Sequence, residues 1–220
     1  MDLNKGLFLN LIVVAPDQSE KGTRDLSQNI IQGLTKPEIV DVVGIGASIP
    51  LVVAAVDLSK AIANVNIDFV SLDYVPLTAT YKPEAIFFEL SREPSEIPSI
   101  VSEFERLLEV ERNMKTIRVS RGDRLDTITN LLLWKLSKNN IIKVLASGFA
   151  ITTAIRSILQ VTTSGISKDQ VGVSAITTDS IERGEGTGKK VPAIQVYLDK
   201  GKATTYSARH EDVVKQVVVR

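Results

Sequence analysis

The sequence predicts an α/β fold made of two tandem domains that share the element order β-α-β-α-β-β. Residues 141–160 (IIKVLASGFAITTAIRSILQ) have the pattern of a short buried strand, a glycine turn and an amphipathic helix, and residues 39–58 (IVDVVGIGASIPLVVAAVDL) repeat it. Apolar residues between 26 and 56 coincide without a gap with apolar residues 102 positions later. With 220 residues, 44% of them hydrophobic, the chain can fill two such cores. Together these observations indicate an old duplication.

The elements of the first domain follow from apolar periodicity and from glycine and proline. Continuous or alternating apolar runs indicate strands, and apolar stripes at three- and four-residue spacing indicate helices. Gly46 opens the turn between the second strand and the second helix, and Pro50 suits the first turn of that helix. The expected elements are strands at 7–14, 39–45, 67–75 and 85–90 and helices at 24–34 and 49–63.

The same pattern restarts at Lys115. Asp123 is a candidate N-cap for the first helix of this second domain. Trp134 lies in LLLWKL, an almost wholly apolar helical stretch. We therefore expect that helix to be covered on two sides, partly by the other domain, rather than to present Trp134 as a base-stacking platform. Residues 179–190 (DSIERGEGTGKK) are expected to form a polar, glycine-rich hairpin loop. The expected elements are strands at 116–120, 141–145, 170–178 and 191–198 and helices at 125–136 and 150–161.

These elements divide the chain into four parts. They are an acidic domain at 1–92, a linker helix at 93–114, a basic domain at 115–200 and a tail at 201–220. The linker helix is predicted from one apolar stripe within an acidic surface. The tail is polar except for a late VVKQVVV run, which predicts an edge strand.

The net charge of zero conceals a segregation of charge. Residues 1–110 contain 8 Lys and Arg against 16 Asp and Glu, whereas residues 111–220 contain 18 against 10. This asymmetry indicates either a basic half that binds a partner such as nucleic acid, or acidic and basic faces that attract each other within the molecule.

Composition excludes several kinds of site. The chain has no cysteine, and its only histidine, His210, is in the tail. We therefore expect no thiolate or multi-histidine metal site and no Ser-His-Asp triad within the domains. No segment has the pattern of a signal peptide, and no apolar stretch is expected to reach the ~18 residues that span a bilayer. We expect a soluble, cytoplasmic protein without a membrane partner.

The pattern I-x-V-x-A-x-G-x-A-I-x-x-A-I at residues 142–155 resembles the Alba family of archaeal chromatin proteins. The second domain is similar to that family over 115–200, and the first looks like the same domain with a shortened hairpin. The resemblance implies a cofactor-free protein that binds DNA or RNA without strong sequence preference. Because the family forms dimers, it also implies that the two domains pair as an intramolecular pseudo-dimer. Whether that unit pairs further, as a homo-oligomer, is left open.

The resemblance also implies where nucleic acid binds. The family uses basic residues after the first strand and along the last hairpin. Of the adjacent basic residues that the family places after the first strand, only Arg121 is present here, followed by Gly122. The candidates are the basic residues that recur around that strand and its loop, Lys115, Arg118, Arg121 and Arg124, and those of the hairpin, Arg183, Lys189 and Lys190, with Lys135, Lys138 and Lys143 as an alternative set. The chain departs from the family beside the two turn glycines, where Ser147, Phe149, Ile45 and Ala47 are uncharged. Each missing cation removes part of the phosphate affinity.

Two functional hypotheses follow. In the first, the basic domain binds nucleic acid. In the second, the chain is a non-catalytic scaffold whose acidic domain docks a basic protein. We do not expect an enzyme, because no nucleophile, base and orienting group can be assembled. GEGTGKK lacks the spacing of a phosphate-binding loop, and Gly44-x-Gly46 lacks the third glycine of a dinucleotide-binding turn.

Overall fold

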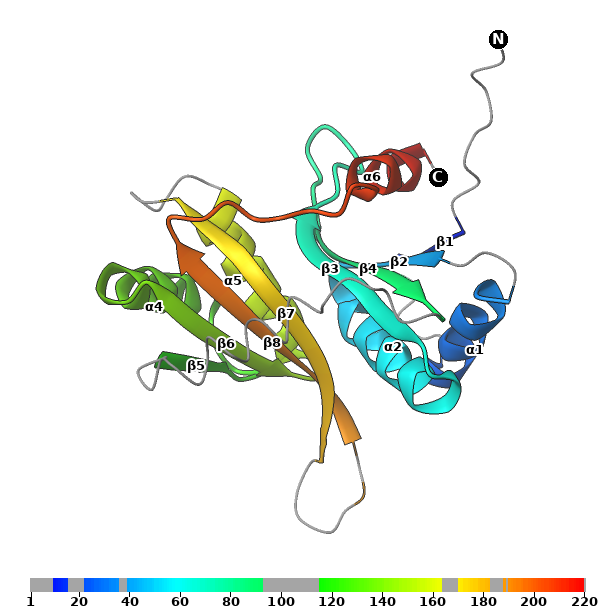
Figure 1. The fold of residues 1–220 in the computed structure, drawn as a ribbon. Coiled ribbons are helices and arrows are strands. Elements are labelled where there is room, and N and C mark those ends of the chain that lie inside the picture. The colour runs from blue at the N-terminus through cyan, green and yellow to red at the C-terminus, as the bar shows by residue number, and fades with distance from the viewer. Residues whose placement is uncertain are drawn as a thin grey trace.

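The computed structural model describes residues 10–15, 22–35, 39–92, 115–163, 170–182, 188 and 190–219. These residues form two α/β units, each built on a four-stranded mixed sheet (Figure 1). The predicted linker helix at 93–114 lies outside the described residues, as do Arg183 and Lys189.

The first unit has the predicted element order. It comprises β1 (Leu11–Val14), α1 (Thr23–Gly33), β2 (Ile39–Ile45), α2 (Ile49–Ala63), β3 (Asn66–Tyr74) and β4 (Glu84–Ser91). Its strands lie in the order β1-β2-β4-β3, with β1 parallel to β2 and the other pairs antiparallel. A short 3-10 turn, Gly46–Ser48, joins β2 to α2.

The second unit repeats this arrangement. It comprises β5 (Lys115–Val119), α4 (Leu125–Lys138), β6 (Ile141–Ser147), α5 (Ala150–Thr163), β7 (Val171–Glu182) and β8 (Lys190–Lys200), in the sheet order β5-β6-β8-β7. The similarity extends to detail, because a register shift interrupts β3 between Ile67 and Phe69 and β7 between Val173 and Ala175. The turn glycines Gly46 and Gly148 have φ of 57° and 56°.

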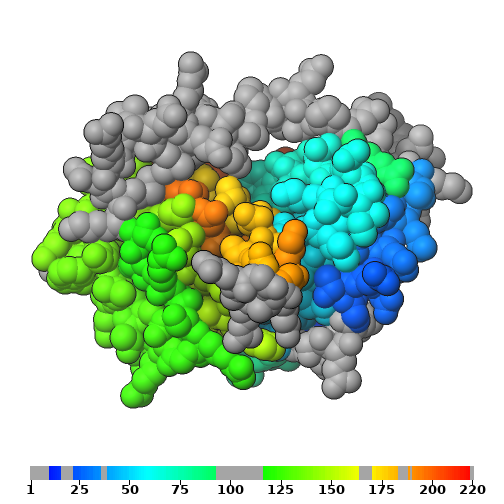
Figure 2. All heavy atoms as spheres, turned by 90° about the horizontal axis from the view of Figure 1, so that it is seen from below, coloured from blue at the N-terminus to red at the C-terminus, as the bar shows by residue number. Residues whose placement is uncertain are grey.

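The two units pack on each other reciprocally. Helix α2 of the first unit contacts β7 and β8, while α5 of the second unit contacts β3 and β4. Buried residues from both units belong to one continuous apolar core. Seen from below, the β7–β8 ribbon, yellow to orange, lies between the green second unit and the cyan first unit (Figure 2).

The β7–β8 ribbon is longer than the sequence predicts. Residues 179–182, expected in the hairpin loop, continue β7. The first unit supports this extension, because the Asp57 carboxylate of α2 accepts a hydrogen bond of 2.7 Å from the Ser180 hydroxyl and a longer one from Thr178.

The prediction of an edge strand in the tail is wrong, because that run is the helix α6 (His210–Val219). Val213 and Val217, four residues apart, lie on one face of α6 and pack against the sheet of the first unit, on the face opposite α1 and α2 (Figure 1). The sheet residues they cover include Val43 and Phe87. Helices therefore cover both faces of the first sheet.

One apolar segment is longer than expected. Residues Gly46–Ala63, which include α2, have the length and composition of a membrane-spanning helix, with a mean hydropathy of 1.5. Half of this segment is buried inside the protein, since Val52, Val53 and Val56 face the core. Its apolar character is accounted for by packing between the two units.

Candidate nucleic-acid interface

The candidate interface starts at the edge of the second sheet where β5 and β6 end. These strands are parallel, with Val119 opposite Ala146, so the loops that follow them lie side by side. Arg121 in the first loop and Phe149 in the second meet there, with 5.2 Å between the guanidinium carbon and the ring centroid. Phe149 is 71% exposed, so this edge presents a ring and a cation together to solvent.

Local hydrogen bonds fix the Arg121 loop. The Asp123 carboxylate accepts a 2.7 Å hydrogen bond from the Ser120 amide, and the Asp123 amide donates to the Ser120 carbonyl. The prediction that Asp123 caps α4 is wrong, because Arg124 occupies the N-cap position and no side chain caps the helix. Asp123 instead closes the turn, which brings Arg121 and Arg124 to the same edge.

The β7–β8 ribbon extends beyond this same edge. The last residue of β6, Ser147, lies opposite Ala193, and the Gly148 amide donates a 2.8 Å hydrogen bond to the Pro192 carbonyl. Lys190, at the start of β8 and exposed, therefore lies past the end of β6. Of the predicted site residues, Arg121, Arg124 and Lys190 thus lie beside or beyond one edge.

Two other predicted residues lie elsewhere on β5. Arg118 is exposed on the sheet face opposite α4 and α5, because its neighbours Ile117 and Val119 are buried. Lys115 begins the strand beside Ile142, at the far end from Arg121. The structure therefore does not gather all the basic residues of this half into one cluster.

The cations at the edge have no acidic partner among the described residues. Within the described part of the chain, no carboxylate forms a salt bridge with Arg118, Arg121, Arg124 or Lys190. By contrast, two other arginines of the basic half bind acids of the first half. Arg156 pairs with Glu84, and Arg209 pairs with Asp41, each at 2.6 Å. Attraction between the two halves thus accounts for part of the charge segregation, but it does not account for the cations at the edge.

The expectation that Trp134 is covered is wrong. Only one face of α4 packs into the core, through Ile128, Leu132 and Leu136, and Trp134 lies on the opposite face with 48% of its surface exposed. The Lys138 ammonium lies 4.3 Å from the centre of the Trp134 ring system, and that of Lys135 lies 5.0 Å away. The four-residue spacing of Ile128, Leu132 and Leu136 in the sequence indicates a single buried face, but the uninterrupted apolar run LLLW also suggests burial on two sides.

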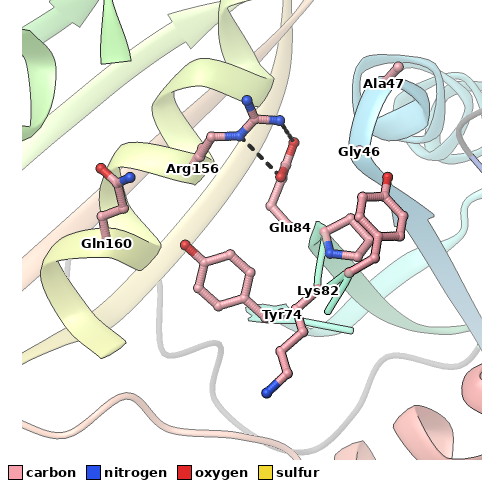
Figure 3. Close-up of a pocket in the computed structure, with 9 residues that line it drawn as sticks. Gly46, Ala47, Tyr74, Lys82, Glu84, Arg156 and Gln160 are labelled. Atoms are coloured by element: carbon pink, nitrogen blue, oxygen red, sulfur yellow. Dashed lines mark hydrogen bonds and ion pairs between the residues drawn. The ribbon is translucent and has the colours of Figure 1, made fainter. Parts of the chain in front are cut away.

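A cavity of about 500 Å³ lies between the two units on another side of the molecule, lined by residues of both. Glu84 and Arg156 point toward each other across it (Figure 3), joined by hydrogen bonds of 2.6 and 3.2 Å. The hydrogen bond with Glu84 raises the pKa of Arg156, and burial raises the pKa of the nearby Tyr74 hydroxyl. Because the two charges satisfy each other, we assign this pair a role in holding the units together.

The tail places the single histidine of the chain against the first unit, beside a serine and an aspartate. Helix α6 brings His210 between Ser71, 3.3 Å from Nδ1, and Asp73, 3.1 Å from Nε2. However, Ser71 is 3% exposed and the adjoining cavity measures about 10 Å³, so a substrate has no access to the hydroxyl. The arrangement satisfies a buried histidine beneath α6.

Comparison with known proteins adds no assignment, because no protein-family model and no curated protein matches the chain.

Proposed function

We propose that this protein binds DNA or RNA without strong sequence preference, as a non-catalytic, Alba-like pseudo-dimer within one chain. The observation that carries the proposal is the group of cations Arg121, Arg124 and Lys190, which lie beside or beyond one edge of the second unit and form no salt bridge with another described residue. Contacts to phosphate supply most of the affinity of sequence-independent binding. Arginine is well suited to them, because its planar guanidinium binds phosphate oxygens in pairs.

The first unit has a structural role in this proposal. The equivalent edge of its sheet has the uncharged residues Gly46 and Ala47. There the buried Ser48 hydroxyl joins the ends of β1 and β2, because it donates a 2.6 Å hydrogen bond to the Val14 carbonyl and accepts one from the Ile45 amide. Its sheet is covered by α6, and Arg209 of the same chain pairs with the acidic residue Asp41. The reciprocal packing of α2 and α5 supports a pseudo-dimer, with the covalent connection replacing the cost of association.

The test compares two variants with the same change in charge. Arg121→Ala combined with Arg124→Ala removes two edge cations, and Arg24→Ala combined with Lys60→Ala removes two exposed cations of the first unit. We expect the first variant to bind duplex DNA and RNA more weakly and to reduce the slope of log K against log salt by about 1.8, while the control keeps the wild-type slope. Equal losses in the two variants would move the interface away from this edge.

A further inference from the structure

We infer that the protein binds unpaired nucleotides, whose bases stack on Trp134 and Phe149. This inference rests on the proposed function and specifies the nucleic acid that the second unit prefers. The two rings are the most exposed aromatic residues of that unit, and each has a cation 4.3–5.2 Å from its centre. Stacking platforms beside a basic path are the usual means of binding single strands without sequence preference.

The neighbours of Trp134 favour a nucleic acid over an apolar protein partner. On the outward face of α4, Trp134 lies among the exposed polar side chains of Thr127, Asn130 and Ser137. Docking surfaces for proteins instead have contiguous apolar area. An isolated ring among polar groups suits a base, which needs one flat face for stacking and polar surroundings for its sugar and phosphate.

Charge on α4 indicates the side on which the backbone would run. With 3.6 residues per turn, Arg124, Lys135 and Lys138 lie toward one side of the Trp134 stripe, and the exposed Asp126 lies toward the other. A nucleotide stacked on Trp134 therefore has cations within reach on one side and a repelling carboxylate on the opposite side.

The two aromatic positions lie on connected surface. Arg124 and Trp134 are separated by about 15 Å along the axis of α4, and Arg121, beside Phe149, lies just before Arg124 in the same loop. Helix α4, in green, lies on the side of the second unit away from the first (Figures 1 and 2), so the first unit leaves this path open. A single strand of several nucleotides can span both rings. The bases of a duplex are already stacked on one another inside the double helix, so they are not available to the two rings.

The experiment uses the full chain, whose single tryptophan makes fluorescence specific for Trp134. The protein is titrated at low salt with a single strand of about 12 pyrimidine nucleotides, as DNA and as RNA, with a duplex of equal length, and with an abasic strand that has the same phosphates. We expect the single strands to quench Trp134 and to bind at least tenfold more tightly than the abasic strand. Neither the duplex nor the abasic strand should produce the same quenching.

Variants test the two rings separately, with labelled strands as the readout. Phe149→Leu and Trp134→Leu should each weaken single-strand binding roughly 5- to 150-fold while leaving abasic binding unchanged. The matched control is Tyr81→Leu, which removes an exposed ring from the first unit. Equal binding of base-bearing and abasic strands without quenching, or tighter binding of the duplex, would overturn this inference and leave the proposed function standing. Failure of every strand to bind would overturn both.

Discussion

The ion pair between Arg156 and Glu84 gives a quantitative test of how the two units are held together. The Glu84 side chain is 4% exposed and accepts two hydrogen bonds from the guanidinium of Arg156, whose side chain is 48% exposed. Arg156→Met keeps most of the aliphatic length but leaves the carboxylate buried without a partner. Breaking a fully buried pair costs about 3–5 kcal/mol, and because solvent reaches Arg156 we expect about 2–3 kcal/mol here.

A double-mutant cycle separates the interaction from other effects of the substitution. Glu84→Gln removes the stranded charge, so the double variant should recover about half of the lost stability, with a coupling free energy above about 1 kcal/mol. Urea denaturation is followed by Trp134 fluorescence, which reports on the second unit, and by circular dichroism, which reports on both. Because the units share one core, the two transitions should coincide.

The control is Lys215→Met, which removes a cation from a largely exposed pair with Asp212 and should change stability by less than about 0.5 kcal/mol. A coupling free energy near zero between Arg156 and Glu84, or separate transitions for the two probes, would refute the reasoning that this contact joins the units.

Two further predictions concern the tail. Burial, opposed by Arg209, raises the pKa of Asp41 to about 6. The folded carboxyl therefore holds its proton more tightly than the unfolded one. As the pH rises from about 4 to 6, the free energy of unfolding of the wild type should fall by up to roughly 3 kcal/mol relative to that of Asp41→Asn, measured by denaturation at each pH. Gly172→Ala should destabilise by about 1–3 kcal/mol, since its Cβ would lie 2.4 Å from the Ala203 carbonyl carbon, whereas Gly122→Ala meets no atom within 4 Å.

Local sequence determined much of the fold. Strand β2 and helix α2 begin and end where predicted, because a buried apolar run, the turn glycine Gly46 and Pro50 at the helix start all favour the same boundaries. The second unit followed from the same signals at Gly148. These features depend on residues near one another in the chain, which is why the sequence predicts them.

The features that were missed depend on contacts between distant residues. The β-branched VVKQVVV run favours a strand by local preference, but it forms α6 because Val213 and Val217 cover the first sheet. The extended β7 is supported by Asp57 from the other unit. The exposure of Trp134 and its proximity to Lys138 likewise depend on which face of α4 packs. The sequence therefore predicts the basic loop but not the exposed ring.

The central claim is that the second unit binds phosphate through its edge cations. A salt titration of the intact chain with duplex DNA and with RNA, followed by fluorescence anisotropy of labelled strands, tests it most directly. If Arg121, Arg124 and Lys190 each neutralise one phosphate, the slope of log K against log salt for duplex DNA should be about −2.7 or steeper. A slope near zero, or no measurable binding at low salt, would contradict the claim.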